Sequence, residues 1–266
     1  MKRPARRAPR ARYAPGAETL AAAARAVHEV RFEGRSADAA LEAVAERADR
    51  AAVRAIALGT LRWYLRLEPA IAPLLSRPMA EMSPALAALL VTAAHQVEYS
   101  RGAPEAQVHL AVDASRIVGE PRASGMVNAV LRRFVATRAD LLAKVDEDLA
   151  ARHAHPAWLV QAVQAAWGER TERILAANNA HPPMVLRTNS AQMGAEDFLR
   201  AWRAMGREAH VLDWNADAVE LEHPAPVQLL PGFDTGAVSV QDAGAQLAAP
   251  LLDAAAGMRV LDACAA

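Results

Sequence analysis

The sequence predicts a mainly α protein with a small α+β part near its end, and three observations lead to this fold class. Apolar side chains recur every three or four residues from residue 18 to about residue 140, which is the period of amphipathic helices. After residue 183, short apolar runs alternate with a helical stretch, as in a small α+β module. The last ten residues join an apolar run to an acid and small residues, which is typical of the first strand of a doubly wound, Rossmann-like domain.

Composition and charge limit the function classes. The chain of 266 residues is 53% hydrophobic, with much of that figure alanine, and it has one cysteine, Cys264. A disulfide framework is therefore excluded, and a reducing compartment is expected. No apolar run approaches the ~20 residues of a membrane span, so we expect a cytoplasmic protein with no membrane partner. The expected segments are a basic disordered arm (1–17), an all-α bundle (18–140), a helical connector (141–183), a small α+β module (184–235) and the start of the doubly wound domain (236–266).

The first twelve residues form a basic arm in a chain whose formal net charge is zero. The arm contains no acid, and each arginine in it could pair with a backbone phosphate of RNA. Two alternatives are a solvated, disordered terminus and an organelle transit peptide; we rank the transit peptide below a bacterial cytosolic origin. The candidate RNA-binding residues of the arm are Arg3, Arg6, Arg7, Arg10 and Arg12.

The expected bundle consists of consecutive helices and no strand. Ser83 and Pro84 have the residue types of an N-cap and a first helical position, and another helix begins at Pro104. The last helix begins near Ala123, with a polar Asn128 beside its apolar stripe and Arg132 and Arg133 on the opposite side. That stripe consists of Val127, Val130, Leu131 and Phe134.

The sequence of the connector predicts three short helices, one at 141–149, one beginning at Pro156 and one at about 169–178. His153 and His155 could suggest a metal site, but no cysteine and no third ligand lie nearby in the sequence. We therefore expect structural or capping histidines and no metal.

The α+β module predicts strands at 184–189, 208–214, 218–222 and 236–241, with a helix at 195–205. This order is that of a ferredoxin-like or RNA-recognition module. The module lacks the aromatic pair that stacks bases in RNA-recognition motifs, so independent base readout is not expected. Asp242 is expected to cap a following helix, and 258–261 to form the final strand. We expect this tail to pack loosely, because a central strand needs neighbours on both sides.

Two phrases of the bundle, Gly59-Thr-Leu-Arg62 and Gly125-Met-Val-Asn-Ala-Val-Leu-Arg-Arg133, resemble the helical domain of the NusB family over residues 18–140. The resemblance implies an RNA-binding bundle, with Arg132 and Arg133 as candidate contacts. The alternative is that the second phrase is only the most buried helix of the bundle.

The rest of the chain resembles the RNA cytosine-C5 methyltransferases. The phrases that carry this resemblance stand in the order of that family, and together with a NusB-like domain they resemble the RsmB/Sun family of bacterial 16S rRNA methyltransferases. They are His155-Pro-Ala-Trp158, Asn178-Asn179 with Pro182-Pro183, Leu186-Arg-Thr-Asn189, Pro231-Gly-Phe233, Val240-Gln-Asp242 and Val260-Leu-Asp-Ala-Cys-Ala-Ala266.

The resemblance implies S-adenosylmethionine as cofactor and 16S rRNA as partner of a monomer. Asp262, Cys264, Ala265 and Ala266 match the start of the family's cofactor loop. In the family one cysteine adds to C6 of cytosine, and a second is needed after methyl transfer to C5. Both lie beyond the matched loop, so this chain contains no catalytic residue and is expected to be inactive alone.

Two other function classes remain open. A NusB-like bundle could serve as a non-enzymatic RNA-binding or antitermination module, although residues 141–266 would then have no role. The final strand could also belong to a nucleotide-binding domain of another enzyme, which the ordered phrases upstream disfavour.

Overall fold

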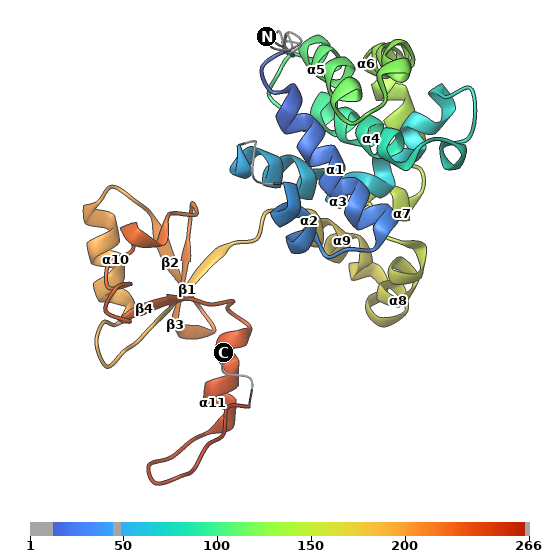
Figure 1. Ribbon diagram of the computed structural model, residues 1–266. Helices are drawn as coiled ribbons and strands as arrows, with labels where there is room; N and C mark the ends of the chain where they lie inside the picture. The colour runs from blue at the N-terminus through green and yellow to red at the C-terminus, as the bar shows by residue number, and fades with distance from the viewer. Residues whose placement is uncertain (1–12, 45–48, 264–266) are drawn as a thin grey trace, which may run out of the picture. The chain divides into compact units, whose positions relative to one another are not determined.

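The computed structural model describes residues 13–44 and 49–263 and divides into two compact units, the first ending at Asn179 and the second beginning at Ala180 (Figure 1). None of the helices in the described ranges is both long and apolar enough to cross a bilayer.

The first unit is helical throughout its described residues, as predicted. Its six main helices form the bundle, and three shorter ones follow. They are α1 (Ala17–Glu33), α2 (Ala37–Val44), α3 (Arg50–Ile71), α4 (Pro84–Tyr99), α5 (Pro104–Ile117), α6 (Ser124–Val145), α7 (Leu149–Arg152), α8 (Ala157–Trp167) and α9 (Thr171–Asn179). Short 3-10 turns lie between some of them: η1 (Ala72–Leu74), η2 (Met79–Glu81), η3 (Pro121–Ala123) and η4 (Gly168–Arg170).

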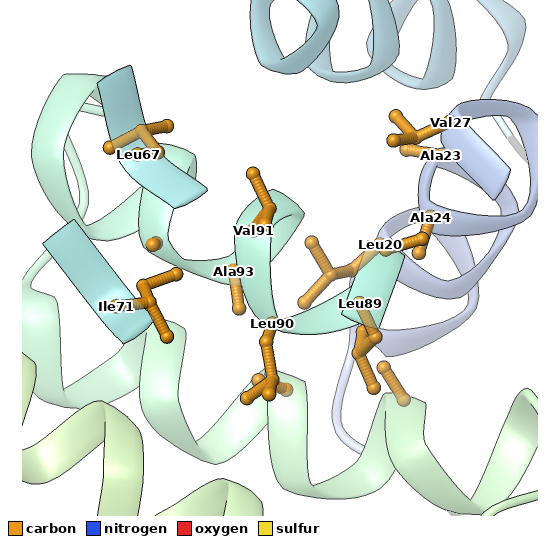
Figure 2. Packing of buried hydrophobic residues seen from close by; sticks show 14 of the residues in the cluster. Leu20, Ala23, Ala24, Val27, Leu67, Ile71, Leu89, Leu90, Val91 and Ala93 are labelled. Atoms are coloured by element: carbon orange, nitrogen blue, oxygen red, sulfur yellow. The ribbon is translucent and has the colours of Figure 1, made fainter. Parts of the chain in front are cut away.

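Helix α4 is the centre of the bundle and contacts α1, α3, α5 and α6. It is apolar around almost its whole circumference, which is the pattern of a fully buried helix, and Leu89 and Leu90 are completely buried. Alanines along α1 allow that helix to approach α4 closely (Figure 2). The predicted stripe of α6 lies in the same core, since Val127, Leu131 and Phe134 are fully buried.

Some element boundaries differ from the sequence prediction. The structure adds α2, whose first turn is capped by the Ser36 hydroxyl, which accepts a hydrogen bond from the Ala39 amide at 3.3 Å. The separate helix expected at 141–149 is wrong, because α6 continues without a break to Val145, and Leu142 is buried in the bundle. Ser83 is the N-cap residue of α4, but its side chain makes no capping bond.

The described part of the expected arm, residues 13–17, lies against the bundle rather than forming a free arm. The Ala14 amide donates to Asp113 at 2.9 Å, and the Ala17 side chain at the start of α1 is fully buried.

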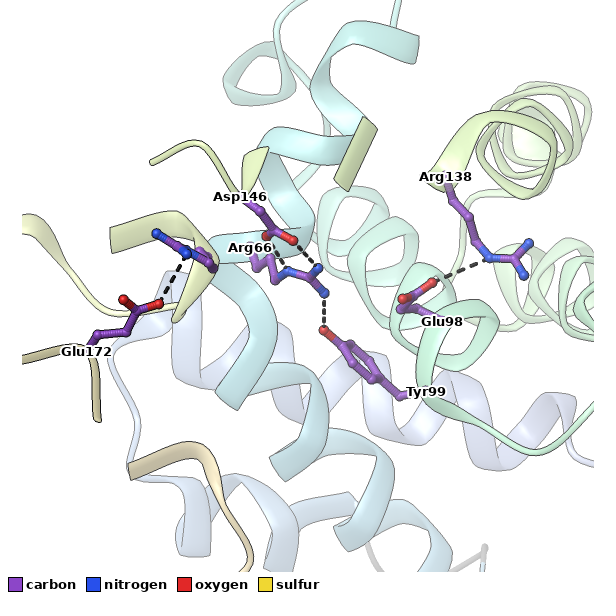
Figure 3. A network of polar contacts seen from close by, with 7 residues as sticks. Arg66, Glu98, Tyr99, Arg138, Asp146 and Glu172 are labelled. Atoms are coloured by element: carbon purple, nitrogen blue, oxygen red, sulfur yellow. Dashed lines mark hydrogen bonds and ion pairs between the residues drawn. The ribbon is translucent and has the colours of Figure 1, made fainter. Parts of the chain in front are cut away.

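A polar cluster joins the end of α6 to α3 and α4 (Figure 3). The Arg66 guanidinium on α3 donates to both carboxylate oxygens of Asp146, at 2.7 and 2.6 Å, and to the Tyr99 hydroxyl at 2.7 Å. The bonds to Asp146 raise the pKa of Arg66, and burial raises that of Tyr99. The bidentate geometry fixes the last turn of α6 against the bundle.

The second unit contains a four-stranded antiparallel sheet with strand order β2-β3-β1-β4. One helix, α10 (Ala195–Ala204), connects β1 to β2, so the strand order and this first connection are those of a split βαβ, ferredoxin-like module. The strands are β1 (Met184–Thr188), β2 (Ala209–Leu212), β3 (Asn215–Leu221) and β4 (Val238–Val240). The sheet therefore extends past residue 235, where the sequence-based limit of the module was placed.

Helix α10 covers one face of this sheet. Leu186 and its cross-strand partner Val219 are fully buried in a cluster with Phe198 and Trp202 of α10. The sequence alternation therefore predicted the strands correctly. Between β3 and β4 the chain forms only a 3-10 turn, η5 (Val227–Leu229), where a full ferredoxin-like fold has a second helix.

After β4 the chain lacks the strand expected at 258–261 in its described residues, and its tail packs loosely, as expected. Asp242 caps a short helical segment, η6 (Ala245–Leu247) followed by α11 (Ala248–Leu252), through a bond from the Ala245 amide at 3.1 Å. The strand expected at 258–261 is absent from the described residues, because no neighbouring strand there supplies its ladder bonds. Val260 is 56% and Leu261 86% exposed, which confirms a loosely packed tail.

Candidate nucleic-acid interface

A groove of about 680 Å³ lies on the bundle between the segment after α3 and the start of α6. Its floor is apolar, with Met82, Leu86 and Val130 almost completely buried. Residues from η1, the loop before α4, η3 and α6 converge there although they are far apart in the sequence. We call it the arginine-rimmed groove.

Three arginines, Arg77, Arg122 and Arg133, line this groove together with one acid, Glu120. All three are exposed, and no ion pair engages any of them among the described residues. Arg133 makes a long bond of 3.5 Å to the Leu74 carbonyl, which places it at the edge of the groove. The excess of positive charge above an apolar floor is suited to a nucleic-acid backbone with exposed bases.

Arg132 and Arg133 are both exposed, as expected, but they line different hollows. Arg132 borders a smaller pocket of about 190 Å³ between α5 and α6, with Glu105 and Val108. Its Nε atom also donates to the Asn128 side-chain oxygen at 3.0 Å, which identifies the partner of the polar Asn128. The sequence pointed to Arg133 but missed Arg77 and Arg122, because Arg77 lies in a loop and Arg122 in the short turn η3, where there is no helical repeat to mark them.

The other candidate residues lie at the two ends of the chain. Arg3, Arg6, Arg7, Arg10 and Arg12 fall outside the described residues, and so do Cys264, Ala265 and Ala266. Asp262 is described and lies in the exposed tail, where residues 257–263 form neither helix nor strand.

The two connector phrases, around His155 and at Asn178-Asn179, meet in space. His155 Nδ1 lies 2.5 Å from the His153 carbonyl, which also accepts a bond from the Asn179 amide group at 2.6 Å. Asn178 Nδ2 lies 3.4 Å from His155 Nε2. These contacts join the turn before α8 to the end of α9. Within the described ranges, no group of three or more histidine, cysteine or acidic residues is arranged to hold a metal.

Comparison with protein families agrees with this two-part architecture. Residues 18–136 match the NusB family, and residues 155–228 match the ferredoxin-like domain of RsmF/B-like methyltransferases. The class of protein is therefore one that joins a NusB-type bundle to the ferredoxin-like module of RsmF/B-like methyltransferases.

Similarity to three bacterial proteins defines the family more specifically than the two domain matches do. The chain is 42% identical over 221 residues to ribosomal RNA small subunit methyltransferase B of Pseudomonas syringae pv. tomato, covering 83% of this chain and 49% of that protein. The protein of that name from Pseudomonas putida is 41% identical, covering 87% and 53%, and the one from Klebsiella pneumoniae 35% identical, covering 92% and 57%. The chain belongs to the ribosomal RNA small subunit methyltransferase B family, and it spans about half the length of these curated relatives.

The fold has a counterpart among solved structures. The crystal structure of PH0851 superposes with a TM-score of 0.57 at 15% sequence identity, covering 89% of this chain and 55% of that one. At this identity the likeness concerns the fold alone.

Proposed function

We propose that this chain is the N-terminal part of an S-adenosylmethionine-dependent methyltransferase that forms 5-methylcytosine in 16S rRNA. The observation that carries the proposal is the succession of a NusB-family bundle and an RsmF/B-like module, in a chain up to 42% identical to relatives named small subunit rRNA methyltransferase B. The whole protein acts as a cytoplasmic monomer. A non-enzymatic antitermination module is the weaker candidate, because it leaves the ferredoxin-like module without a role.

In this proposal the bundle binds rRNA at the arginine-rimmed groove. Arg77, Arg122 and Arg133 neutralise phosphates, and the apolar floor with Met126 contacts a base or ribose. Arg132 contacts a neighbouring phosphate, and Arg3, Arg6, Arg7, Arg10 and Arg12 extend the basic surface. Each phosphate contact removed by substitution reduces the magnitude of the slope of the RNA-binding constant against salt concentration, on logarithmic axes, by about 0.7 for single strands.

Fluorescence anisotropy with a labelled RNA tests the role of the groove. We expect the triple variant R77Q/R122Q/R133Q to bind RNA more weakly, with a salt slope lower by about 2. The matched control is R54Q/R62Q/R101Q, which removes the same charge from exposed arginines that do not line the groove. Equal loss of affinity in both variants would show that only net charge matters and would contradict the groove.

We also propose that Asp262, Cys264, Ala265 and Ala266 begin the S-adenosylmethionine loop of a catalytic segment that follows β4. The segments before it are the basic arm, the bundle through the end of α6 at Val145, the connector, and the ferredoxin-like module through β4 (Val238–Val240). The two catalytic cysteines of the family lie beyond Ala266. The test is transfer of a labelled methyl group to cytosine C5 of 16S rRNA by a protein extended through its full reading frame. If the labelled methyl group is transferred to the RNA but no 5-methylcytosine is found, the proposed activity is contradicted.

A further inference from the structure

A polar pocket of about 350 Å³ lies at one end of the ferredoxin-like sheet. The end of β1, the start of β3 and the start of β4 meet there, because β1 is antiparallel to both neighbours. Arg187 of β1 has Ser239 of β4 as its cross-strand partner, and both line the pocket. The remaining lining residues are Thr188, Asn189, Ser190, Asp217 and Gly236.

Hydrogen bonds to two backbone carbonyls hold the walls of this pocket. The Asn189 amide donates to the Ala237 carbonyl at 2.8 Å, and the Thr188 hydroxyl donates to the Asp217 carbonyl at 3.1 Å. Several polar groups are left to face a ligand. In the part of the chain that the structure describes, no hydrogen bond or ion pair engages the Arg187 guanidinium or the hydroxyls of Ser190 and Ser239.

The donor and acceptor set of the pocket fits a ribonucleotide. A guanidinium with two neighbouring hydroxyls presents donors to a phosphate. Asp217 is the acid of the pocket, and a carboxylate accepts a hydrogen bond from a hydroxyl, such as the 2′-hydroxyl that distinguishes RNA from DNA. A base-stacking platform is a poorer fit, because none of the four strands contains Phe, Tyr or Trp.

We propose that this pocket is a second RNA contact, on the ferredoxin-like module, in which Arg187 binds a backbone phosphate and Asp217 accepts a hydrogen bond from a ribose 2′-hydroxyl. The inference rests on the proposed function, since it takes RNA as the partner. It deepens that function by assigning sugar-phosphate recognition to the module, separate from the arginine-rimmed groove of the bundle.

The test is anisotropy of this chain with a fluorescein-labelled oligocytidylate of about 12 nucleotides and with the DNA of the same sequence. R187Q is expected to weaken RNA binding about tenfold, as for loss of a charged hydrogen bond, and to lower the salt slope by about 0.7. D217A is expected to bring the RNA and DNA affinities closer together. R200Q is the matched control, because Arg200 is an exposed arginine of α10 outside the pocket. Thermal unfolding verifies that each variant is folded.

The outcomes separate this inference from the proposed function. If R187Q binds RNA as R200Q does while the groove variant binds weakly, the second contact is refuted and the groove stands. A weakened R187Q beside an unaffected groove variant supports the pocket and refutes the groove. An unchanged preference for RNA over DNA in D217A overturns the role of Asp217. Absence of RNA binding by the unaltered chain overturns both proposals.

Discussion

Gly59 of α3 shows why one residue of a family phrase must be small. A Cβ atom at this position would lie 2.7 Å from Cε1 and Nε2 of the His95 ring on α4. The glycine therefore lets α3 and α4 approach each other around His95. By contrast, an added Cβ at Gly125 of α6 has no atom within 4 Å, so packing gives no reason for a glycine there.

We predict that Gly59→Ala destabilises the bundle by about 1–3 kcal/mol, the usual cost of overpacking, even though alanine is the better helix former. Gly125→Ala is the control, with a change between zero and about 1 kcal/mol of stabilisation. Urea denaturation measures both. A Gly59→Ala protein as stable as the Gly125→Ala protein would show that His95 moves away freely.

Gly232, in the Pro-Gly-Phe phrase, combines a positive φ of 78° with close packing. Its added Cβ would lie 2.9 Å from the Ala237 Cβ, whereas Gly206, with φ of 73°, has no atom within 4 Å of an added Cβ. The left-handed backbone conformation destabilises both alanine variants by about 1 kcal/mol or more. We predict that Gly232→Ala alone loses a further amount of stability, about 1–2 kcal/mol, through the close contact with Ala237. Thermal unfolding measures both variants. Equal losses would contradict the packing argument.

His95 gives the bundle a defined response to acid. Burial lowers its pKa to about 4, against about 6.5 in the unfolded chain. The unfolded state therefore binds the proton first as pH falls, and stability is lost between about pH 6.5 and pH 4, by up to about 3 kcal/mol. Above pH 6.5 the contribution is fully present.

The variant His95→Gln tests this linkage. The difference in unfolding free energy between His95→Gln and the unaltered chain should shift by about 3 kcal/mol in favour of the variant between pH 7 and pH 4. His109→Gln, which removes an exposed imidazole of α5, is the control for the loss of a histidine side chain. A difference for His95→Gln that stays constant with pH would mean that the ring is not buried as described.

Among the elements, the end of α6 is joined to α3 and α4 by one arginine, Arg66. Arg66→Gln removes the bidentate pair with Asp146 and the bond to Tyr99. We predict that the free energy of unfolding falls by about 2 kcal/mol, because Asp146 is left without its partner in a site where it is only 28% exposed. The control is Arg138→Gln. Arg138 is 37% exposed, against 15% for Arg66, and its single contact with Glu98 at 3.4 Å should contribute less than about 1 kcal/mol. Similar losses in guanidinium denaturation would contradict this ranking.

The sequence predicted elements well where the signal is local. The four strands and α10 followed from alternation and helical spacing, and Pro84 and Pro104 do begin helices. Helix α2 was missed because its apolar face is short, although Ser36 was a usable start signal. The strand at 258–261 was wrong because a strand exists only with neighbours, which a local pattern does not contain. The groove was also beyond local patterns, since Arg77, Arg122 and Arg133 meet only after folding.

At the scale of the whole molecule, several residues of the family phrases have structural roles. Gly59 and Gly232 permit close packing, Asn178 and Asn179 join α9 to the turn before α8, and Asp242 caps a helical segment. Only a few phrase residues, among them Arg133 and Arg187, lie exposed at a groove or pocket. Similarity of sequence therefore identifies the architecture, and the exposed residues show where RNA contacts are to be sought.

The central claim is that this chain is the front part of a methyltransferase, and calorimetry of S-adenosylmethionine binding tests it most directly. The titration is made on this chain and on a protein extended through its full reading frame. We predict binding by the extended protein and none by this chain, in which the exposed residues 257–263 form neither helix nor strand. If the extended protein, shown to be folded, also fails to bind, the methyltransferase account is contradicted and an RNA-binding module becomes the better explanation.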